Sequence, residues 1–509
     1  MWITRLEGRA LTAGITTTCG TAFMLFGFDQ GVFGGLLGLP LFQSTFGYPS
    51  AMIQGQIVSS YDIGCILGAL MTMFVGDIIG RRKTISLACV FVVFGGIVQS
   101  SSYSLPQMIV GRIVAGLGIG MNSVAVPMWQ SETCNPEHRG KLIALQLVLV
   151  IGGIALSNWM NLGFSYVADN HVSWRFPLAF QSFIALVAIA LVACMPESPR
   201  WLCAKDRHAE AQVIIGQLLA KPADDEAVVE FLQRVISSIA HERELARVGW
   251  RDIFTNGEQQ NFRRIALGAG TSLMQQMGGI NVVVYYMPVI LTTSFGFDSR
   301  QALILSACDF MSLMIWGSMA MLVIDKWGRK KLMLIGALAQ GICFTIAAAG
   351  LGVGTKASQA IAVAAIFLYH VFFGLSFLSI PFCYPSEINS QRMRNVGSSV
   401  AMITNWVFVY VIVLATPIGI ENIGWKFYII FAVTNIAWLP FIWYFYIETA
   451  GLSLEEIDRL FEIKYKAEQP MSWKEAMRLA KEEVLSSSSH SCEKELEDAA
   501  VVHQELAGK

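Results

Sequence analysis

Long apolar runs alternate with short polar connections along the whole chain, and this pattern already predicts the fold. Twelve runs are almost free of charge, at residues 12–37, 56–78, 84–103, 107–129, 142–164, 175–195, 264–291, 302–324, 332–352, 360–384, 396–418 and 425–446. An α-helix needs about 20 apolar residues to cross the hydrocarbon core of a bilayer. The pattern therefore predicts an all-α polytopic membrane protein in which each run is one transmembrane helix.

Composition excludes the alternative that these runs are buried helices of a soluble protein. Of 509 residues, 54% are hydrophobic and only 14% are charged, and the mean hydropathy is +0.53. Soluble globular chains carry about 25% charged residues. The net charge of −1 gives no reason to expect a nucleic-acid partner. Ten cysteines lie scattered without CxxC spacing, so neither a disulfide nor a metal site is expected.

One acid interrupts the first apolar run. Asp29, in FGFDQGVFGG at 26–35, is the only charged residue between Leu11 and Leu39. A charge near the bilayer centre costs roughly 2.5–3.5 kcal/mol, so an acid there is a candidate for function. Arg112 is likewise the only charged residue of the fourth run. Because a buried charge usually needs a partner, we expect Asp29 and Arg112 to pair.

Basic residues predict the orientation, because cytoplasmic loops carry the excess of Lys and Arg. They gather in every second connection, as RRK at 81–83, Arg139 with Lys141, the segment 196–263, KWGRKK at 326–331, and Arg392 with Arg394. Both termini are therefore expected in the cytoplasm, with the plasma membrane as the expected location. The first apolar run is too long for the core of a cleavable signal peptide.

Three motifs recur in the same order, which indicates an internal duplication. Gly80 of GDIIGRRK recurs as Gly328 of IDKWGRKK (328 − 80 = 248), and Glu197 of PESPRWL recurs as Glu448 (448 − 197 = 251). Ser-Glu followed by Arg seven residues after the acid occurs at 131–139 and again at 386–394. The chain then divides into a cytoplasmic N-terminus (1–10), a six-helix half (11–202), an intracellular helical linker (203–262), a second six-helix half (263–448) and a cytoplasmic tail (449–509) that is largely disordered at its end.

Two parallel six-helix halves are the plan of the major facilitator superfamily, which binds its substrate near the midplane between the halves. The motifs GRR, PESPRWL, QQMGGINVVVYY and ETAGLSLEEID, in this order, resemble those of its sugar porter family, and TPIGIENIGWKFYIIFAVTN at 416–435 is similar to the fungal branch. The resemblance implies a transporter of a monosaccharide, hexose or pentose, that works by proton-coupled symport and alternating access. It implies no cofactor beyond the proton as coupling ion, and function as a monomer in the lipid bilayer.

The sugar site is expected to use amides and aromatic rings, because a sugar is neutral and covered with hydroxyls. Gln275 and Asn281 are six residues apart, so on a straight helix they would point about 120° away from each other. Gly278-Gly279 lies between them and permits local unwinding. The second half supplies such groups, and the candidate substrate-binding residues there are Gln275, Gln276, Asn281, Phe382, Asn405 and Trp406. The resemblance implies that the first three bind sugar hydroxyls, and it adds Gln146 from the first half. An interhelical hydrogen bond is the alternative role of any one of these amides.

Two positions depart from the family and bear on the substrate. Phe382 stands where the family often has tryptophan, so the indole N–H donor is lost, and Leu313 stands where it often has asparagine. Both changes favour a less polar ligand than glucose, such as a pentose, a deoxy sugar or a polyol.

The resemblance assigns two further groups of residues. Tyr285 and Tyr286 would close over the sugar as an external gate, and packing is their alternative role. A salt-bridge network on the cytoplasmic side would stabilise the outward-facing state, formed by Asp77, Arg81, Arg82, Glu132, Arg139, Glu197, Arg200, Asp325, Arg329, Glu387, Arg394 and Glu448. Anchoring of helices at the headgroup level is the alternative for these charges. Asp29 and Arg112 would couple transport to protons, or else form a structural ion pair.

Other function classes find less support. An enzyme is not expected, because the chain has no nucleophile elbow, P-loop or HExxH motif. A sugar sensor with this fold would carry repeated interaction motifs in its tail, and residues 449–509 have none. A polyol, a quinate-like acid or a pathway metabolite is the alternative substrate, although an anion would need a central cation beyond Arg112.

Overall fold

The computed structural model describes residues 6–134, 139–167, 169–245, 257–390, 393–467 and 471–483. Every regular element within these ranges is helical. The first half contains α1 (Gly8–Leu36), the short α2 (Pro40–Thr45), α3 (Ala51–Ile79), α4 (Arg81–Ser100), α5 (Leu105–Thr133), α6 (Arg139–Ser165) and α7 (Val172–Cys194). The second half contains α12 (Asn261–Met277), α13 (Ile280–Thr293), α14 (Ser299–Trp327), α15 (Arg329–Val353), α16 (Lys356–Leu375), α17 (Ile380–Ile388), α18 (Arg394–Ile423) and α19 (Lys426–Phe445).

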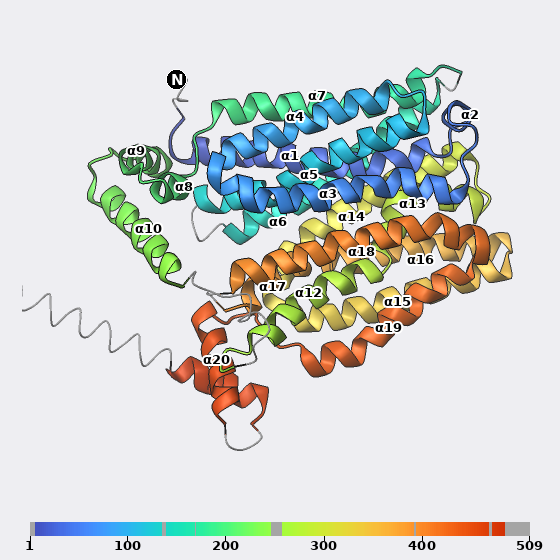
Figure 1. The fold of residues 1–509 in the computed structure, drawn as a ribbon. Coiled ribbons are helices and arrows are strands. Elements are labelled where there is room, and N and C mark those ends of the chain that lie inside the picture. Colours follow the sequence, from blue (N-terminus) through green and yellow to red (C-terminus); the bar gives the residue numbers. More distant parts are fainter. Residues whose placement is uncertain are drawn as a thin grey trace, which may run out of the picture.

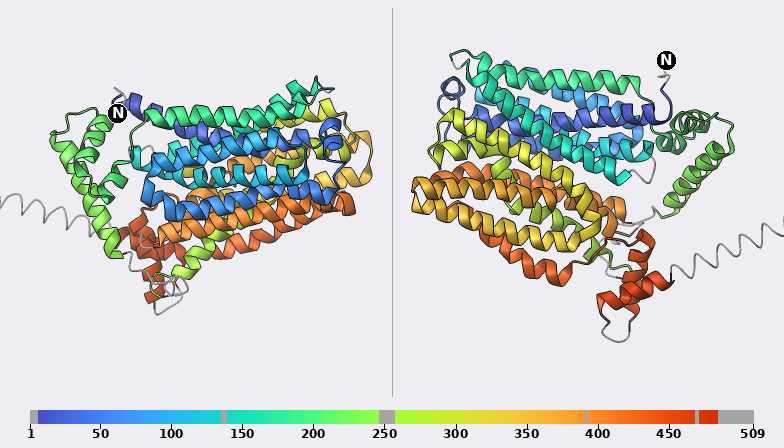
Figure 2. Two further views of the ribbon diagram at one scale, coloured as in Figure 1. Left: turned by 45° about the horizontal axis from the view of Figure 1, so that its top comes forward. Right: turned by 180° about the vertical axis from the view of Figure 1, so that it is seen from behind.

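The two halves lie side by side as two bundles of long helices (Figures 1 and 2). Ten helical spans of the described residues are long and apolar enough to cross a bilayer. The two remaining predicted spans, 56–78 and 264–291, correspond to α3 and to the consecutive helices α12 and α13. The prediction of an all-α bundle is confirmed.

Large apolar side chains cover the outside of the bundle. Phe74, Leu322, Trp443 and Tyr444 are each more than two thirds exposed. Such a surface is expected where lipid is the solvent, because the bilayer core is as apolar as these side chains.

Smaller helices gather at one end of the bundle, together with the start of α1 (Figure 1). They are α8 (Pro199–Ala204), α9 (His208–Leu219), α10 (Glu226–Leu245), α20 (Leu454–Lys466) and a helix over 473–483. We call this the terminal end, and we call the opposite end, which holds α2 and the end of α13, the distal end. The linker helices form a small core of their own around Leu202, Ile215 and Val228. Residues 484–509 of the tail lie outside the described residues.

A glycine seam joins α3 to α5. It consists of Gly64 and Gly68 on α3 and Gly116 and Gly120 on α5, and a Cβ at any of them would lie 2.1–2.2 Å from a carbonyl oxygen of the other helix. Small residues four apart let two membrane helices bring their backbones into contact. The seam therefore fixes how α3 and α5 lie against each other.

The halves meet through α1 against α13, α3 against α18 and α6 against α14. Near the distal end the first two contacts are close. A Cβ at Gly34 would lie 3.0 Å from the Tyr285 carbonyl oxygen, and a Cβ at Gly55 would lie 2.9 Å from that of Leu414. The halves are thus in backbone contact near the distal end.

Candidate functional site

The helix that carries QQMGGIN is broken where the glycine pair predicts it. Helix α12 ends at Met277 and α13 begins at Ile280, and Gly279 has a φ of +91°. Neighbouring helices satisfy the freed Gly278 carbonyl, which accepts from the Tyr369 hydroxyl at 3.2 Å and from Asn435 Nδ2 at 3.1 Å. The predicted unwinding is confirmed, and α16 and α19 hold it in place.

The break brings the predicted amides into one hydrogen-bond network. Gln276 Nε2 donates to Asn405 Oδ1 at 2.6 Å, and Asn281 Nδ2 donates to Gln276 Oε1 at 2.5 Å. Gln276 Nε2 also lies 3.3 Å from Gln275 Oε1, while Gln275 Nε2 donates to the Phe377 carbonyl at 2.7 Å. All four amide side chains are at most 7% exposed. Residues from α12, α13 and α18 therefore form a single buried patch of amides.

Other predicted binding residues retain unused hydrogen-bonding groups. The Trp406 ring, beside Asn405 on α18, packs on Phe26 of the first half at 5.5 Å between centroids. Its Nε1 has no hydrogen-bond partner among the described residues, and the same holds for both side-chain ends of Gln146 on α6. Both side chains are buried. Because buried polar atoms are normally paired, these groups are candidates to bind a polar ligand.

The two positions that depart from the family lie in the second half. Phe382 is half-buried on α17. Leu313 is fully buried on α14, where its side chain faces Gly374. The structure therefore gives Leu313 a packing contact, which is the ordinary role of a buried leucine.

The two tyrosines predicted as a gate point to different partners. The Tyr286 hydroxyl donates to the Val413 carbonyl at 3.0 Å, within the second half. The Tyr285 hydroxyl donates to Asp62 Oδ1 at 3.4 Å and so reaches across to the first half. Both tyrosines are at most 1% exposed. Their role as a gate stays a prediction, but only Tyr285 links the halves through its hydroxyl.

Asp29 and Arg112 form the expected ion pair. Arg112 Nη1 lies 2.9 Å from Asp29 Oδ1, and neither side chain is exposed. The other end of the guanidinium donates to the Val58 carbonyl at 2.9 Å, and its face lies 4.2 Å from the centre of the Phe33 ring. A buried cation is tolerated when an anion and further acceptors surround it in this way. Whether the pair couples transport to protons stays a prediction.

Sequence reasoning missed further buried charges. Asp62 on α3 is unexposed, and Asp309 on α14 lies 2.8 Å from His370 on α16, with both of these side chains unexposed. The signal that identified Asp29, a charged or titratable group deep within an apolar run, would have found all three. Asp309 and His370 are each the only acid, base or histidine of their runs, and Asp62 shares the run 56–78 only with Asp77, near its end. No group of three possible metal ligands occurs among the described residues.

The duplicated motif folds into the same charge cluster twice at the terminal end. In the first half, Arg81 pairs with Asp77 at 2.6 Å and with Glu132 at 3.2 Å. Glu197 accepts from the backbone N–H groups of Arg81 and Arg82 at the start of α4, at 3.1 and 3.2 Å. Burial raises the pKa of the Glu197 carboxyl above its ordinary value. The N–H donors lower this pKa, but their effect is smaller than that of burial.

The second half repeats this arrangement residue by residue. Arg329 pairs with Asp325 at 2.9 Å and with Glu387 at 2.8 Å. Glu448 accepts from the backbone N–H groups of Arg329 and Lys330 at the start of α15, at 2.7 and 3.1 Å. A carboxylate at a helix N-terminus is stabilised by the unpaired N–H groups and the helix dipole.

Each of these contacts joins residues of the same half, so the clusters do not connect the two halves. They hold the ends of α4 and α15 in place, and a role in stabilising an outward-facing state stays a prediction. Of the other predicted members of the network, Arg200 lies in α8 and Arg394 opens α18, while nothing is described of the Arg139 side chain.

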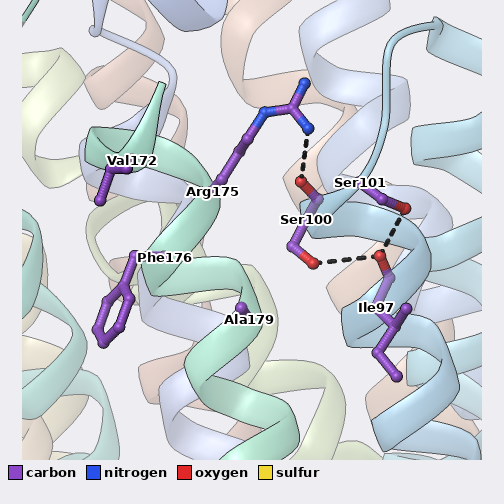
Figure 3. Close-up of a pocket in the computed structure, with 7 residues that line it drawn as sticks. All are labelled: Ile97, Ser100, Ser101, Val172, Arg175, Phe176 and Ala179. Atoms are coloured by element: carbon purple, nitrogen blue, oxygen red, sulfur yellow. Dashed lines mark hydrogen bonds between the residues drawn. The ribbon is translucent and has the colours of Figure 1, made fainter. Parts of the chain in front are cut away.

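A hollow on the surface lies away from the amide network. It measures about 420 Å³ and lies between α4 and α7, toward the distal end (Figure 3). Arg175 borders it and donates to the carbonyls of Ser100 and Ser102, each at 3.1 Å. Arg175 thus fastens the start of α7 to the end of α4.

Comparison with known proteins identifies the relatives of this chain. Residues 14–461 match the family model described as "Sugar (and other) transporter". The chain is 40% identical to the MFS-type transporter oryC of Aspergillus oryzae over 467 residues (90% of this chain and 86% of that protein). It is 35% identical to the sugar transporter STL1 of Saccharomyces cerevisiae over 505 residues (96% and 87%). Among solved structures, the proton:xylose symporter XylE of E. coli, bound to 6-bromo-6-deoxy-D-glucose, superposes with a TM-score of 0.74 at 25% identity, over 89% of this chain and 99% of that one.

Proposed function

The chain belongs to the sugar (and other) transporter family, and on this premise we propose that it carries a monosaccharide, a hexose or a pentose, across the membrane together with a proton. It is a multi-pass membrane transporter and not an enzyme. The proposed mechanism is alternating access, in which the two halves rock about a site between them.

The observation that carries the proposal is the buried amide network of Gln275, Gln276, Asn281 and Asn405. Amides both donate and accept, which suits hydroxyl groups that do the same. None of these side chains is charged, so a neutral ligand meets no uncompensated charge there. Trp406 beside the network adds an aromatic face with an unused N–H donor, and a sugar can offer a C–H face and a hydroxyl to it.

The way the halves are joined supports rocking. Each half holds its own terminal-end charges. Near the distal end, the described residues join the halves through glycine contacts, the Tyr285–Asp62 hydrogen bond and Arg300 over the Tyr166 ring, and none of these is an ion pair. Separating the halves at the distal end therefore costs few charged contacts. Rigid-body motion of two internally stable units is a common form of conformational switching.

The buried pair of Asp29 and Arg112 supports proton coupling. An acid held in apolar surroundings can change its charge only when a proton or water reaches it, and such acids commonly form proton relays in transporters. The similar protein XylE is described as a proton:xylose symporter. We propose that protonation within this cluster weakens the ion pair and permits the conformational change.

We further propose a monomer in the plasma membrane with the terminal end in the cytoplasm. The basic clusters at 81–83 and 326–331 lie at that end and favour this orientation.

The test is uptake by cells that lack hexose carriers of their own. Cells expressing the chain should take up at least one labelled hexose, pentose or polyol saturably, and cells with an empty vector should not. Uptake that rises at acidic external pH and falls with a protonophore supports symport, whereas uptake that ignores both indicates a facilitator. If no sugar or polyol enters although the protein is at the cell surface, the sugar proposal fails and a sensor becomes the better reading.

A further inference from the structure

Asp62 is a second buried acid beside Arg112. It lies on α3, one helical turn after Val58, whose carbonyl accepts from Arg112 Nη2 at 2.9 Å. The glycine seam holds α3 against α5, which carries Arg112, so this neighbourhood is fixed by the backbone. Electrostatic interaction of Asp62 with both Arg112 and Asp29 follows from this placement. Asp62 is completely unexposed.

The charges of this cluster do not balance. Arg112 supplies one positive charge, while Asp29 and Asp62 supply two carboxyl groups, all of them unexposed. Asp29 takes the ion pair at 2.9 Å. The Oδ2 atoms of both Asp29 and Asp62 are buried with no hydrogen-bond partner among the described residues. When two carboxyl groups share a site of low polarity they cannot both be ionised at low cost, and one of them holds a proton.

Asp62 is also a direct polar link between the two halves. Its Oδ1 accepts from the Tyr285 hydroxyl of α13 at 3.4 Å. The backbone carbonyl of Tyr285 also packs against Gly34 of α1, in the first half. Gln30, the residue after Asp29, lies within hydrogen-bonding reach of the same hydroxyl. The acid cluster and the distal contact between the halves are therefore one connected unit.

We propose that Asp29 and Asp62 share one proton around Arg112, and that the distal end closes only when this proton is bound. The inference rests on the proposed proton-coupled transport and names a further residue for it. Closure buries the whole cluster, so the closed state requires a net charge near zero, which one proton supplies. Opening would bring water to Asp62 and allow the second acid to ionise.

Groups on every neighbouring helix bear on this charge balance. They are Asp29 on α1, Tyr61 and Cys65 on α3 itself, Arg112 on α5, and Tyr285 and Tyr286 on α13. Helix α18, which also packs on α3, carries no charged residue between Arg394 and Glu421. The basic residues of α4, at 81–83, lie at the terminal end. Among the described residues around this cluster, Arg112 is thus the cation, and it balances one ionised acid but not two.

The test replaces one acid by its neutral isostere. With Asp62→Asn, Asp29 and Arg112 remain and the cluster has the charge of the protonated state at every pH. Uptake of the substrate found in the screen should then lose its dependence on external pH and on a protonophore, while exchange of substrate across the membrane continues. Asp309→Asn is the matched control, because it removes an unexposed acid from the other half, and it should keep the wild-type pH dependence.

A second variant tests the link to the gate and does not depend on Asp62→Asn folding. Tyr285→Phe removes the donor to Asp62 but leaves the charges intact. A lost donor disfavours the ionised carboxylate, so the external pH of half-maximal uptake should move to a higher value. An unchanged midpoint would overturn the link through Tyr285.

The outcomes separate this inference from the function on which it rests. If wild-type uptake depends on pH and Asp62→Asn keeps the same dependence, Asp29 acts alone and the shared proton is wrong. If Asp309→Asn also loses the dependence, the effect is not specific to the cluster and the inference is again overturned. If wild-type uptake itself ignores pH and protonophore, proton coupling fails, and the shared proton fails with it.

Discussion

Gln276 is the residue through which the proposed sugar site can be tested most directly, because it is the centre of the amide network. Its Nε2 contacts Asn405 and Gln275, and its Oε1 accepts from Asn281. The change Gln276→Ala removes all three contacts at once. If the network binds the sugar, the same change removes a ligand hydrogen bond.

Two effects of different size follow. Losing one hydrogen bond to an uncharged ligand costs about 0.5–1.5 kcal/mol of binding free energy, which corresponds to about a two- to twelve-fold rise in the half-saturating concentration. The variant also leaves Asn281 Nδ2 and Asn405 Oδ1 without this partner, and a stranded buried group costs about 1–3 kcal/mol of stability. Weaker binding and a lower melting temperature are therefore both expected.

A matched control separates the two effects. Gln99 on α4 is also buried, and its Nε2 donates to the Gly111 carbonyl at 3.2 Å, inside the first half. Gln99→Ala should lower the melting temperature of the purified protein in the same way but leave the half-saturating concentration unchanged. Uptake would be measured at matched surface expression, with the substrate identified by the screen.

The reasoning is refuted if Gln276→Ala keeps the wild-type half-saturating concentration. The amides would then serve to pack α12 against α18, and the sugar would bind elsewhere between the halves. The same conclusion follows if Gln99→Ala raises the half-saturating concentration as much as Gln276→Ala does.

Three further predictions follow from geometry. Gly279→Ala should lower the melting temperature, because the φ of +91° at this position costs other residues about 1–2 kcal/mol. An added Cβ would also lie 2.8 Å from the Phe344 ring, and an unchanged melting temperature would contradict this prediction. Gly68→Leu should abolish folded protein in detergent, because a Cβ there would lie 2.1 Å from the Leu117 carbonyl oxygen. The control is Gly163→Leu, where an added Cβ would have no atom within 4 Å, and this variant should elute normally from a sizing column. Asp29→Asn should abolish accumulation against a gradient but keep exchange of substrate, measured by counterflow; retained accumulation would leave Asp29 as a structural partner of Arg112 only.

Those features of the site that depend on local chemistry could be predicted from the sequence. The glycine pair at 278–279 predicted the break in the helix, and the break explains how Gln275 and Asn281 come together although they are six residues apart. The pairing of Asp29 with Arg112 followed from the cost of a lone charge in an apolar run. These inferences needed only residue type, spacing and burial.

The remaining features depend on how helices lie against one another, which a single sequence does not specify. Asp62 carries the same signal as Asp29, but its contact with Tyr285 requires the relative position of α3 and α13. The partners of Arg81 and Arg329 depend on how the helix ends lie against one another, so spacing could name the charged residues but not show that each arginine pairs within its own half.

The duplicated clusters at Glu197 and Glu448 also bear on how the protein is made. Each carboxylate accepts hydrogen bonds from the backbone N–H groups at the start of α4 or α15. The neighbouring arginines, Arg81 and Arg329, each pair with acids of their own half. The first half can therefore complete these contacts during synthesis, before the second half has left the ribosome. A chain interrupted within the linker at 203–262 should accordingly yield two fragments that insert separately and reassemble in the membrane.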